Sequence, residues 1–391
     1  MVPLSELQTR ISKLQDLMQL EGIGGALLVQ RADLFYFSGT GQNAHLFVPA
    51  VGEPRLIVKK TLTRARAESA LDSVIPFKGW HELVALIREA VPTGTKIGLE
   101  TDVIPANLFF RYQKMLDNYI ITDISKVIRK IRSIKSTYEL GLMHDAAIIS
   151  KSVFDHARDI IRVGLTELEL ASQLEMHARR QGHQGAVRMR GFNQEIYYGH
   201  IMSGKNAAAI SFFDGPTGGP GLNPSYPQGA GRAVIKRNEP ILVDFVSIFG
   251  GYMVDQTRIF SLGETASHLS NAYQQALMIK KTLIELGKPG VSGSLLFEKS
   301  ETMAAEAGLA DHFMGCLEKV SFVGHGVGLE LDELPVIASG LETELEAGMV
   351  FALEPKFVFP GEGVVGIEDT FVVGAEKLEQ ITLGSNQLQV L

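Results

Sequence analysis

The stretch ILVDFVSIFGGYMVDQTRIF, residues 241–260, predicts a β-hairpin that carries two aspartates in an otherwise apolar setting. Its Gly250-Gly251 dipeptide is typical of a two-residue hairpin turn between strands. A buried strand normally excludes carboxylates, because removing their charge from water is costly. Asp244 and Asp255 therefore need partners that compensate this cost.

The register of this hairpin predicts that the two aspartates converge. With the turn at the glycines, Asp244 faces Thr257 and Asp255 faces Val246. Side chains alternate along a strand, so all four lie on one face and the aspartates become diagonal neighbours. A bound cation would remove both their repulsion and their desolvation penalty. The alternative is that they lie at exposed strand ends, each paired with a basic residue such as Arg258.

Three further candidate metal ligands lie later in the chain, each in an apolar or glycine-rich context. They are His325 in FVGHGVGLELDELP (322–335), Glu354 in MVFALEPKF (349–357) and Glu368 in VVGIEDTF (364–371). Any one of them alone is commonly a loop or strand-end residue. Together, carboxylates and an imidazole suit manganese, iron(II), cobalt or zinc. Four carboxylates exceed what one ion needs, so we predict two divalent ions that share bridging carboxylates.

The organisation of the chain predicts two domains. Its first part alternates strand patterns (25–29, 55–60 and 96–100) with helix patterns (4–18, 61–72 and 80–91), which indicates an α/β domain. A basic connector, residues 123–136, closes this part. The capping-box pairs Ser136/Glu139 and Thr166/Glu169 then open two long helices. We predict an N-terminal domain over residues 1–132 and a C-terminal domain over residues 133–391.

Composition narrows the classes of protein. A chain of 391 residues with 45% hydrophobic and 21% charged residues is typical of an ordinary soluble globular protein. The net charge of −7 and the lack of a basic block argue against nucleic acid as a partner. The single cysteine, Cys316, fits a reducing compartment. The N-terminus lacks a signal-peptide core and no apolar run reaches membrane-spanning length, so we expect a cytoplasmic protein without a membrane partner.

The five candidate ligands, in this order and context, resemble the metal-binding blocks of the pita-bread metallohydrolases. This family includes prolidase, aminopeptidase P, methionine aminopeptidase and creatinase. The N-terminal segment GALLVQRADLFYFSGT (25–40) resembles the start of the creatinase-type domain, and IRKIRSIKSTYEL (128–140) resembles its junction with the catalytic domain. The resemblance implies a creatinase-type α/β domain followed by an α+β pita-bread catalytic domain.

Carried over by position, the resemblance implies roles for each ligand. Asp244 would bind one metal and Asp255 would bridge both, while His325 and Glu354 would complete the second ion and Glu368 would bridge. It also implies a metal-activated water as nucleophile, Glu354 as general base, manganese as the favoured metal and a homodimer. The implied activity is hydrolysis of a C–N bond in a small peptide or amide, of the Xaa-Pro peptidase or prolidase kind. Two alternatives are a small amide or amidine hydrolase of creatinase type and an inactive binding module.

The chain departs from the pattern of the family's peptidases at four places. Asp332 stands where they carry a second histidine, and the segment after SGKNAA (203–208) lacks another. Lys356 stands where a glycine is common after Glu-Pro, and Gly366 where an arginine is frequent. We expect Asp332 to bind a cationic substrate group or to pair with Lys356.

Two further features are expected to shape the substrate pocket. His200, just before the SGKNAA segment, is a candidate substrate-binding residue, together with Asp332 and Lys356. The loop DGPTGGPGLNPSYPQGAG (214–231) holds six glycines and four prolines, and its length suits a lid over the metal site.

Overall fold

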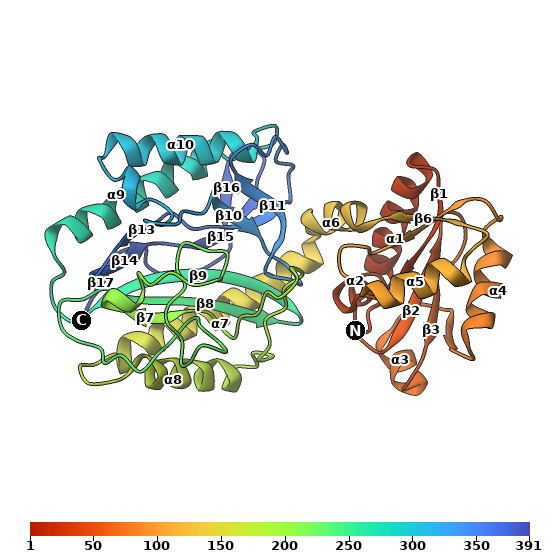
Figure 1. The fold of residues 1–391 in the computed structure, drawn as a ribbon, viewed down its shortest axis with the longest axis horizontal. Coiled ribbons are helices and arrows are strands. Elements are labelled where there is room, and N and C mark those ends of the chain that lie inside the picture. Colours follow the sequence, from red (N-terminus) through yellow and green to blue (C-terminus); the bar gives the residue numbers. More distant parts are fainter. The chain divides into compact units, whose positions relative to one another are not determined.

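The computed structural model describes residues 1–391, which divide into two compact units, Met1–Arg132 and Ser133–Leu391. Each unit has its own sheet system and its own hydrophobic core (Figure 1). None of the helices combines the length and the apolar character that crossing a membrane requires.

The Met1–Arg132 unit is built on a six-stranded mixed sheet with the order β4-β3-β2-β1-β5-β6. The β1–β2 and β2–β3 pairs are antiparallel, and the other three pairs are parallel. Its strands are β1 (Ile23–Leu28), β2 (Ala44–Pro49), β3 (Arg55–Val58), β4 (Val74–Pro76), β5 (Lys96–Leu99) and β6 (Ile120–Asp123). Its helices are α1 (Leu4–Leu20), α2 (Arg31–Ser38), α3 (Leu62–Glu68), α4 (Trp80–Ala90), α5 (Ala106–Met115) and α6 (Ser125–Ser133), whose last residue belongs to the next unit.

The alternation of strands and helices predicted for this unit is confirmed. Leu83 and Ile87 of α4 and Tyr112 of α5 join one buried cluster with sheet residues such as Phe47. The basic connector forms the amphipathic helix α6, and its Arg132 is buried rather than solvated, with its guanidinium 2.5 Å from the Asp33 carboxylate. Amphipathic helices over a mixed sheet are an α/β architecture, as expected.

The Ser133–Leu391 unit contains two main sheets and a two-stranded ribbon. The first sheet has the order β17-β9-β8-β7, the second β11-β10-β12-β15-β16, and the ribbon is β13-β14. The strands are β7 (Ile201–Ser203), β8 (Ile241–Phe249), β9 (Tyr252–Ser261), β10 (Phe322–Gly326), β11 (Glu333–Ala338), β12 (Val350–Leu353), β13 (Lys356–Phe359), β14 (Gly363–Gly366), β15 (Asp369–Val373), β16 (Leu378–Gln380) and β17 (Gln389–Val390). The helices are α7 (Thr137–Ile160), α8 (Glu167–Arg180), α9 (Ser267–Leu286) and α10 (Gly293–Glu306), with short 3₁₀ turns at Gly204–Asn206 and Ala310–His312.

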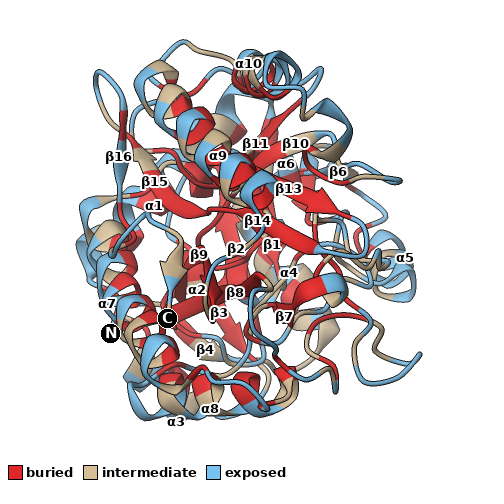
Figure 2. Ribbon diagram, turned by 90° about the vertical axis from the view of Figure 1, so that its left-hand side faces the viewer, coloured by how far each residue is buried: buried red, intermediate tan, exposed pale blue.

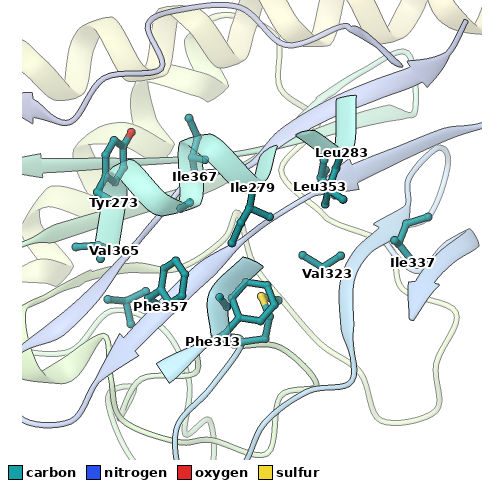
Figure 3. Packing of buried hydrophobic residues seen from close by; sticks show 14 of the residues in the cluster. Tyr273, Ile279, Leu283, Phe313, Val323, Ile337, Leu353, Phe357, Val365 and Ile367 are labelled. Carbon is teal, nitrogen blue, oxygen red and sulfur yellow. The ribbon is translucent and has the colours of Figure 1, made fainter. Parts of the chain in front are cut away.

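Helices cover the sheets of this unit on two sides. The α7 and α8 helices start at the two predicted capping boxes; α7 packs against β8 and β9, and α8 packs against α7 and β7. On the other side, α9 packs on the β13–β14 ribbon and α10 on β11. Figure 3 shows Tyr273, Ile279 and Leu283 of α9 among buried side chains of the strands, including Phe357 and Leu353. This layered core holds the strands that carry the candidate ligands.

Burial differs between the strands and the helices of this unit. Every residue of β8 and β9 except Phe249 is buried, whereas α7 and α9 alternate between buried and exposed residues. Figure 2 shows the same contrast, with red strands and helices that carry both red and pale blue segments. The carboxylates of the β8–β9 hairpin therefore lie on strands that are buried almost throughout.

Candidate metal centre

The β8–β9 hairpin has the register that the sequence predicts. Asp244 pairs with Thr257 and Asp255 with Val246 across the antiparallel ladder. The turn residue Gly250 has φ of 57°, which is the left-handed backbone that this turn type requires. The aspartates therefore share one face of the hairpin, and both are buried.

The second main sheet supplies the remaining candidate ligands. His325 lies on β10, Glu354 directly follows β12, and Glu368 directly precedes β15, and these three strands are neighbours in the sheet. A bridge between Glu368 and Thr257 joins this sheet to the hairpin. Gly324 is required beside His325, because a Cβ there would lie 2.4 Å from the Ala352 carbonyl oxygen. The fold thus brings together all five residues that the sequence analysis assigned as ligands.

His325 presents one ring nitrogen to the carboxylates. Its Nδ1 lies 2.8 Å from the Leu331 carbonyl oxygen, so Nδ1 donates to that carbonyl and Nε2 faces the carboxylates. Nε2 lies 3.9 Å from Asp255 Oδ2, 3.8 Å from Glu354 Oε1 and 3.8 Å from Glu368 Oε1. These separations are too long for hydrogen bonds. Ligand atoms that share one ion at about 2.1 Å lie roughly 3 to 4 Å apart, which is the spacing found here.

One buried oxygen at this place has no protein partner. Glu368 Oε1 forms no hydrogen bond, although the side chain is almost fully shielded from water. Ligand atoms of Asp255, His325 and Glu368 all lie within 4.8 Å of one another. We call these three residues the metal corner. A carboxylate oxygen without a hydrogen bond, an imidazole nitrogen that faces it and a second carboxylate fit one divalent cation.

Lys356 occupies the other side of the carboxylate cluster. Its ammonium donates hydrogen bonds to Glu368 Oε2 at 2.7 Å, Glu354 Oε2 at 2.9 Å and Asp244 Oδ2 at 3.0 Å. We call these four residues the lysine corner. An ammonium has three donors, and the three carboxylates take all of them, so none remains for a substrate. The predicted pairing of Lys356 with Asp332 is wrong, because the acids that Lys356 contacts are these three.

The crowded charges shift the pKa values in opposite directions. Burial raises the pKa of Asp255 well above its usual range, and nearby carboxylates add to the effect. Burial and Glu368 raise the pKa of Glu354 to about 7 against the pull of Lys356. Burial by itself would raise the pKa of Glu368, but Lys356 and His325 lower this pKa to about 2. Burial by itself would lower the pKa of His325, but the surrounding carboxylates raise this pKa to about 10. A divalent cation would relieve this excess of negative charge.

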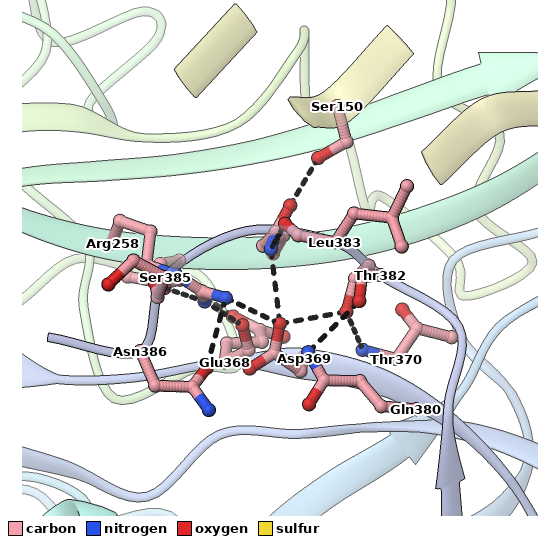
Figure 4. Close-up of polar contacts among 12 residues, drawn as sticks. Ser150, Arg258, Glu368, Asp369, Thr370, Gln380, Thr382, Leu383, Ser385 and Asn386 are labelled. Atoms are coloured by element: carbon pink, nitrogen blue, oxygen red, sulfur yellow. Dashed lines mark hydrogen bonds and ion pairs between the residues drawn. The ribbon is translucent and has the colours of Figure 1, made fainter. Parts of the chain in front are cut away.

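A buried ion-pair network behind Glu368 holds it in place. Asp369 is fully buried and accepts from Lys280 at 2.6 Å and from Arg258 at 2.8 Å. Arg258 also donates to the carbonyl oxygen of Glu368, and Thr257 Oγ1 donates to Glu368 Oε2, both at 2.8 Å. Figure 4 shows the Asp369 carboxylate in contact with Arg258 and Thr382. Sequence reasoning missed this network, although the Ile-Glu-Asp order places Asp369 next to a candidate ligand.

A cavity of about 290 Å³ opens onto both corners. Its wall includes His200, Asp332 and the first part of the predicted loop, Asp214, Gly215, Pro216 and Thr217. The His200 ring lies within 3.4 Å of Thr217 Oγ1 and 3.3 Å of Gln228 Oε1, so two residues of the loop contact it. His200 therefore lines the cavity as expected, but its polar contacts are to the protein.

Asp332 anchors another part of the cavity wall. Its Oδ1 and Oδ2 accept the backbone N–H groups of Arg190 and Gly191, each at 2.7 Å. The N–H of Leu331 donates to the Arg188 carbonyl oxygen at 2.8 Å and reinforces the same contact. Both carboxylate oxygens thus hold the 188–191 segment against the loop that follows His325. The sequence could not indicate this role, because the partners are backbone groups about 140 residues away.

Comparison with known proteins agrees with this geometry. Residues 141–375 match metallopeptidase family M24, and residues 10–134 match the creatinase/prolidase N-terminal domain. Because the first match covers more than half of the chain, the protein belongs to metallopeptidase family M24. It is thus a metal-dependent peptidase with a creatinase-type N-terminal domain and a pita-bread catalytic domain, which confirms the predicted family and fold class. Membership implies divalent metal ions.

Individual relatives align over nearly the whole chain. An Xaa-Pro dipeptidase of Lactobacillus delbrueckii subsp. lactis is 27% identical, with 97% of this chain and 98% of the relative covered. The structure of an Xaa-Pro dipeptidase from Bacillus anthracis is similar with a TM-score of 0.83 and 26% identity, covering 98% of this chain and 100% of that chain. The X-Pro aminopeptidase structure from Thermotoga maritima MSB8 shares the fold, with a TM-score of 0.80, 23% identity and coverage of 97% and 99%.

Proposed function

We propose that this chain hydrolyses the peptide bond between an amino-terminal residue and a following proline, with a divalent metal ion at the metal corner. The relatives from Lactobacillus delbrueckii and Bacillus anthracis support the Xaa-Pro substrate class, because both are Xaa-Pro dipeptidases that align over almost their full length. A small peptide is also the substrate expected for a cavity of about 290 Å³. The two alternatives from the sequence, a small-amide hydrolase and an inactive binding module, are not favoured.

One observation carries the proposal. His325 Nε2 and the orphaned Glu368 Oε1 face each other across 3.8 Å without a hydrogen bond, and both residues line the cavity. A buried carboxylate oxygen left without a partner costs free energy, so a site that retains one is built for a ligand. When bound there, a divalent ion lowers the pKa of water and polarises a carbonyl oxygen.

The protein residues around this place have separate tasks. We assign Asp255, His325 and Glu368 as metal ligands, and the Leu331 carbonyl fixes the His325 tautomer that presents Nε2. Glu354 turns Oε1 toward the metal corner, 3.8 Å from His325 Nε2, and it is assigned as the general base that takes the proton of the attacking water. Asp244 contributes to the lysine corner.

Finer points of the sequence analysis stay proposals. Manganese is the metal we propose, because carboxylates with one imidazole suit it and the family resemblance favours it. The sequence predicts two ions. The hydrogen bonds of Lys356 to three of the carboxylates affect how many ions the site can hold. A homodimer, a cytoplasmic location, the absence of a nucleic-acid partner and a lid role for residues 214–231 likewise stay predictions.

The test is a substrate screen with metal-free and manganese-reloaded protein. Chelator-treated protein should cleave no substrate, and Mn²⁺ should restore cleavage of Xaa-Pro dipeptides. Matched dipeptides with alanine in place of proline serve as the control, since they carry the same scissile amide without the ring. Longer Xaa-Pro peptides separate a dipeptidase from an aminopeptidase, and small cyclic amides test the small-amide alternative.

Two results would contradict the proposal. Equal cleavage of the proline and alanine dipeptides would show that the enzyme is not specific for proline. Undiminished cleavage after complete metal removal would show that the reaction does not need a metal, and the metal corner would then need another explanation.

A further inference from the structure

Lys356 forms the contacts of a bound cation with residues that the sequence analysis assigned to metal. Its ammonium lies 2.7 to 3.0 Å from carboxylate oxygens of Glu368, Glu354 and Asp244, and its side chain is 1% exposed. The first residue of β13 thus places a positive charge inside the cluster rather than at its rim. A divalent ion at this place would lie about 2.0 to 2.2 Å from the same oxygens, so the ion and the ammonium exclude each other.

We propose that the Lys356 ammonium takes the place of one of two metal ions, so that this peptidase works with one metal ion and one built-in cation. The inference rests on the proposed function for the identity of the site. It goes beyond it by assigning a metal stoichiometry and a charge-holding role to a residue of this chain.

The carboxylates are arranged as they would be around two cations. Glu368 directs Oε2 to Lys356 at 2.7 Å and Oε1 toward His325 Nε2 at 3.8 Å. Glu354 does the same, with Oε2 on Lys356 at 2.9 Å and Oε1 at 3.8 Å from His325 Nε2. Each glutamate therefore bridges the lysine corner and the metal corner. Two bridging carboxylates between two positive centres are the pattern of a dinuclear site, with an ammonium as one centre.

The backbone leaves room for this lysine at one specific position. Lys356 pairs with Gly366 across the β13–β14 ribbon. A Cβ at residue 366 would lie 2.6 Å from Lys356 Cα and 2.8 Å from Lys356 Cγ. Any larger residue at position 366 would therefore clash with the backbone of residues 355 and 356 as well as with the lysine side chain. Lys356 and Gly366 are both places where the chain departs from the pattern of related peptidases, and the structure shows that they are in contact.

Charge repulsion opposes a second ion, and the count with one divalent ion leaves a single negative charge. Four carboxylates, Asp244, Asp255, Glu354 and Glu368, surround the two corners, and Lys356 neutralises one unit of their charge. One divalent ion at the metal corner neutralises two more. A second divalent ion beside the buried ammonium would add a repulsive contact between like charges and would need the lysine side chain to leave its three hydrogen bonds.

The test counts metal ions in the full-length protein without reference to activity. Metal-free wild-type protein, Lys356→Gly and Lys356→Ala are each loaded with Mn²⁺, freed of excess metal and analysed by elemental analysis. Electron paramagnetic resonance then distinguishes an isolated Mn²⁺ ion from an exchange-coupled pair. Lys151→Met is the matched control, because Lys151 is half-exposed and pairs with Asp155 on the surface of α7.

We expect one ion per chain with an isolated-ion signal for the wild type and for the Lys151 control, and a second, coupled ion in at least one variant of Lys356. Two coupled ions in the wild type overturn the inference, and so does wild-type protein that binds none. Folded Lys356 variants that all stay at one ion also overturn it. The wild-type count needs no variant, so the inference is testable even if neither variant folds. If the counts are as expected but no Xaa-Pro peptide is cleaved, the proposed function fails and this inference stands.

Discussion

Replacing Asp369 should destabilise the Ser133–Leu391 unit more than replacing a surface aspartate. The Asp369 carboxylate is fully buried and holds two cations, Lys280 and Arg258, that are themselves almost fully buried. It also accepts from Thr382 Oγ1 at 2.8 Å and from Gln256 Nε2 at 3.1 Å. Asp369→Ala removes the acceptor for all four donors and leaves two buried cations without a counter-charge.

The magnitude follows from the different chemistry of the two cations. Removing one partner of a buried ion pair costs about 3 to 5 kcal/mol. Burial already lowers the pKa of Lys280 against the pull of Asp369, so Lys280 can lose its proton when Asp369 is replaced, which limits its share of the cost. Arg258 cannot lose its proton, and only its hydrogen bonds to carbonyl oxygens remain. We therefore expect a loss of about 3 to 5 kcal/mol in the free energy of unfolding.

The assay is urea denaturation of metal-free protein followed by far-UV circular dichroism. Trp80 is the only tryptophan, so its fluorescence reports on the Met1–Arg132 unit separately. Asp155→Ala is the matched control, because Asp155 pairs with Lys151 at 2.5 Å while both side chains are about half-exposed. Exposed pairs contribute about 0.2 to 1 kcal/mol. If Asp369→Ala costs no more than Asp155→Ala, the assumption that this network stabilises the site is refuted.

Three further predictions concern the site and the N-terminal unit. Glu368→Gln should lower Mn²⁺ affinity at least tenfold, because the change removes a charged ligand, and equal affinity in a metal titration would contradict the assignment. Asp332→Ala should lower kcat/KM with metal content unchanged, because the backbone N–H groups of Arg190 and Gly191 lose their charged acceptor. The loss should correspond to about 1.5 to 3 kcal/mol of transition-state binding. Unaltered steady-state kinetics would show that this part of the cavity wall is not needed. Burial lowers the pKa of His45 from 6.5 to about 3, so stability falls as the pH drops below 6.5, by about 2 kcal/mol at pH 5, and His45→Phe should remove this part of the pH dependence of unfolding.

The hairpin and its aspartates could be predicted from the sequence because local rules determine them. A Gly-Gly turn specifies which residues face each other, and the two-residue period of a strand then specifies which side chains share a face. The register of Asp244 and Asp255 followed from these two rules and is confirmed. The two capping boxes are equally local, and both are formed. The ligand types and their order were enough to predict the family, which is also confirmed.

The role of Lys356 could not be read from the sequence, because its partners come from different strands. Asp244 lies 112 residues before it and Glu368 lies 12 residues after it. A long, flexible side chain can reach solvent, a substrate or a neighbouring acid, and only the packing of β8, β13 and β15 decides which one it meets. The sequence analysis singled out Lys356 as unusual but proposed the wrong acid for it, Asp332.

Asp332 shows the same division between local and tertiary information. The sequence marks an aspartate where related peptidases have a histidine, and charge alone suggested a cationic partner. The tertiary structure brings the backbone N–H groups of residues 190–191 to both of its oxygens, which charge alone does not predict. A residue pattern cannot predict which backbone N–H groups an aspartate will bind, because every position except proline carries an N–H. Sequence therefore determined which residue types stand at the site, and the long-range packing of the strands and loops determined which atoms each of them contacts.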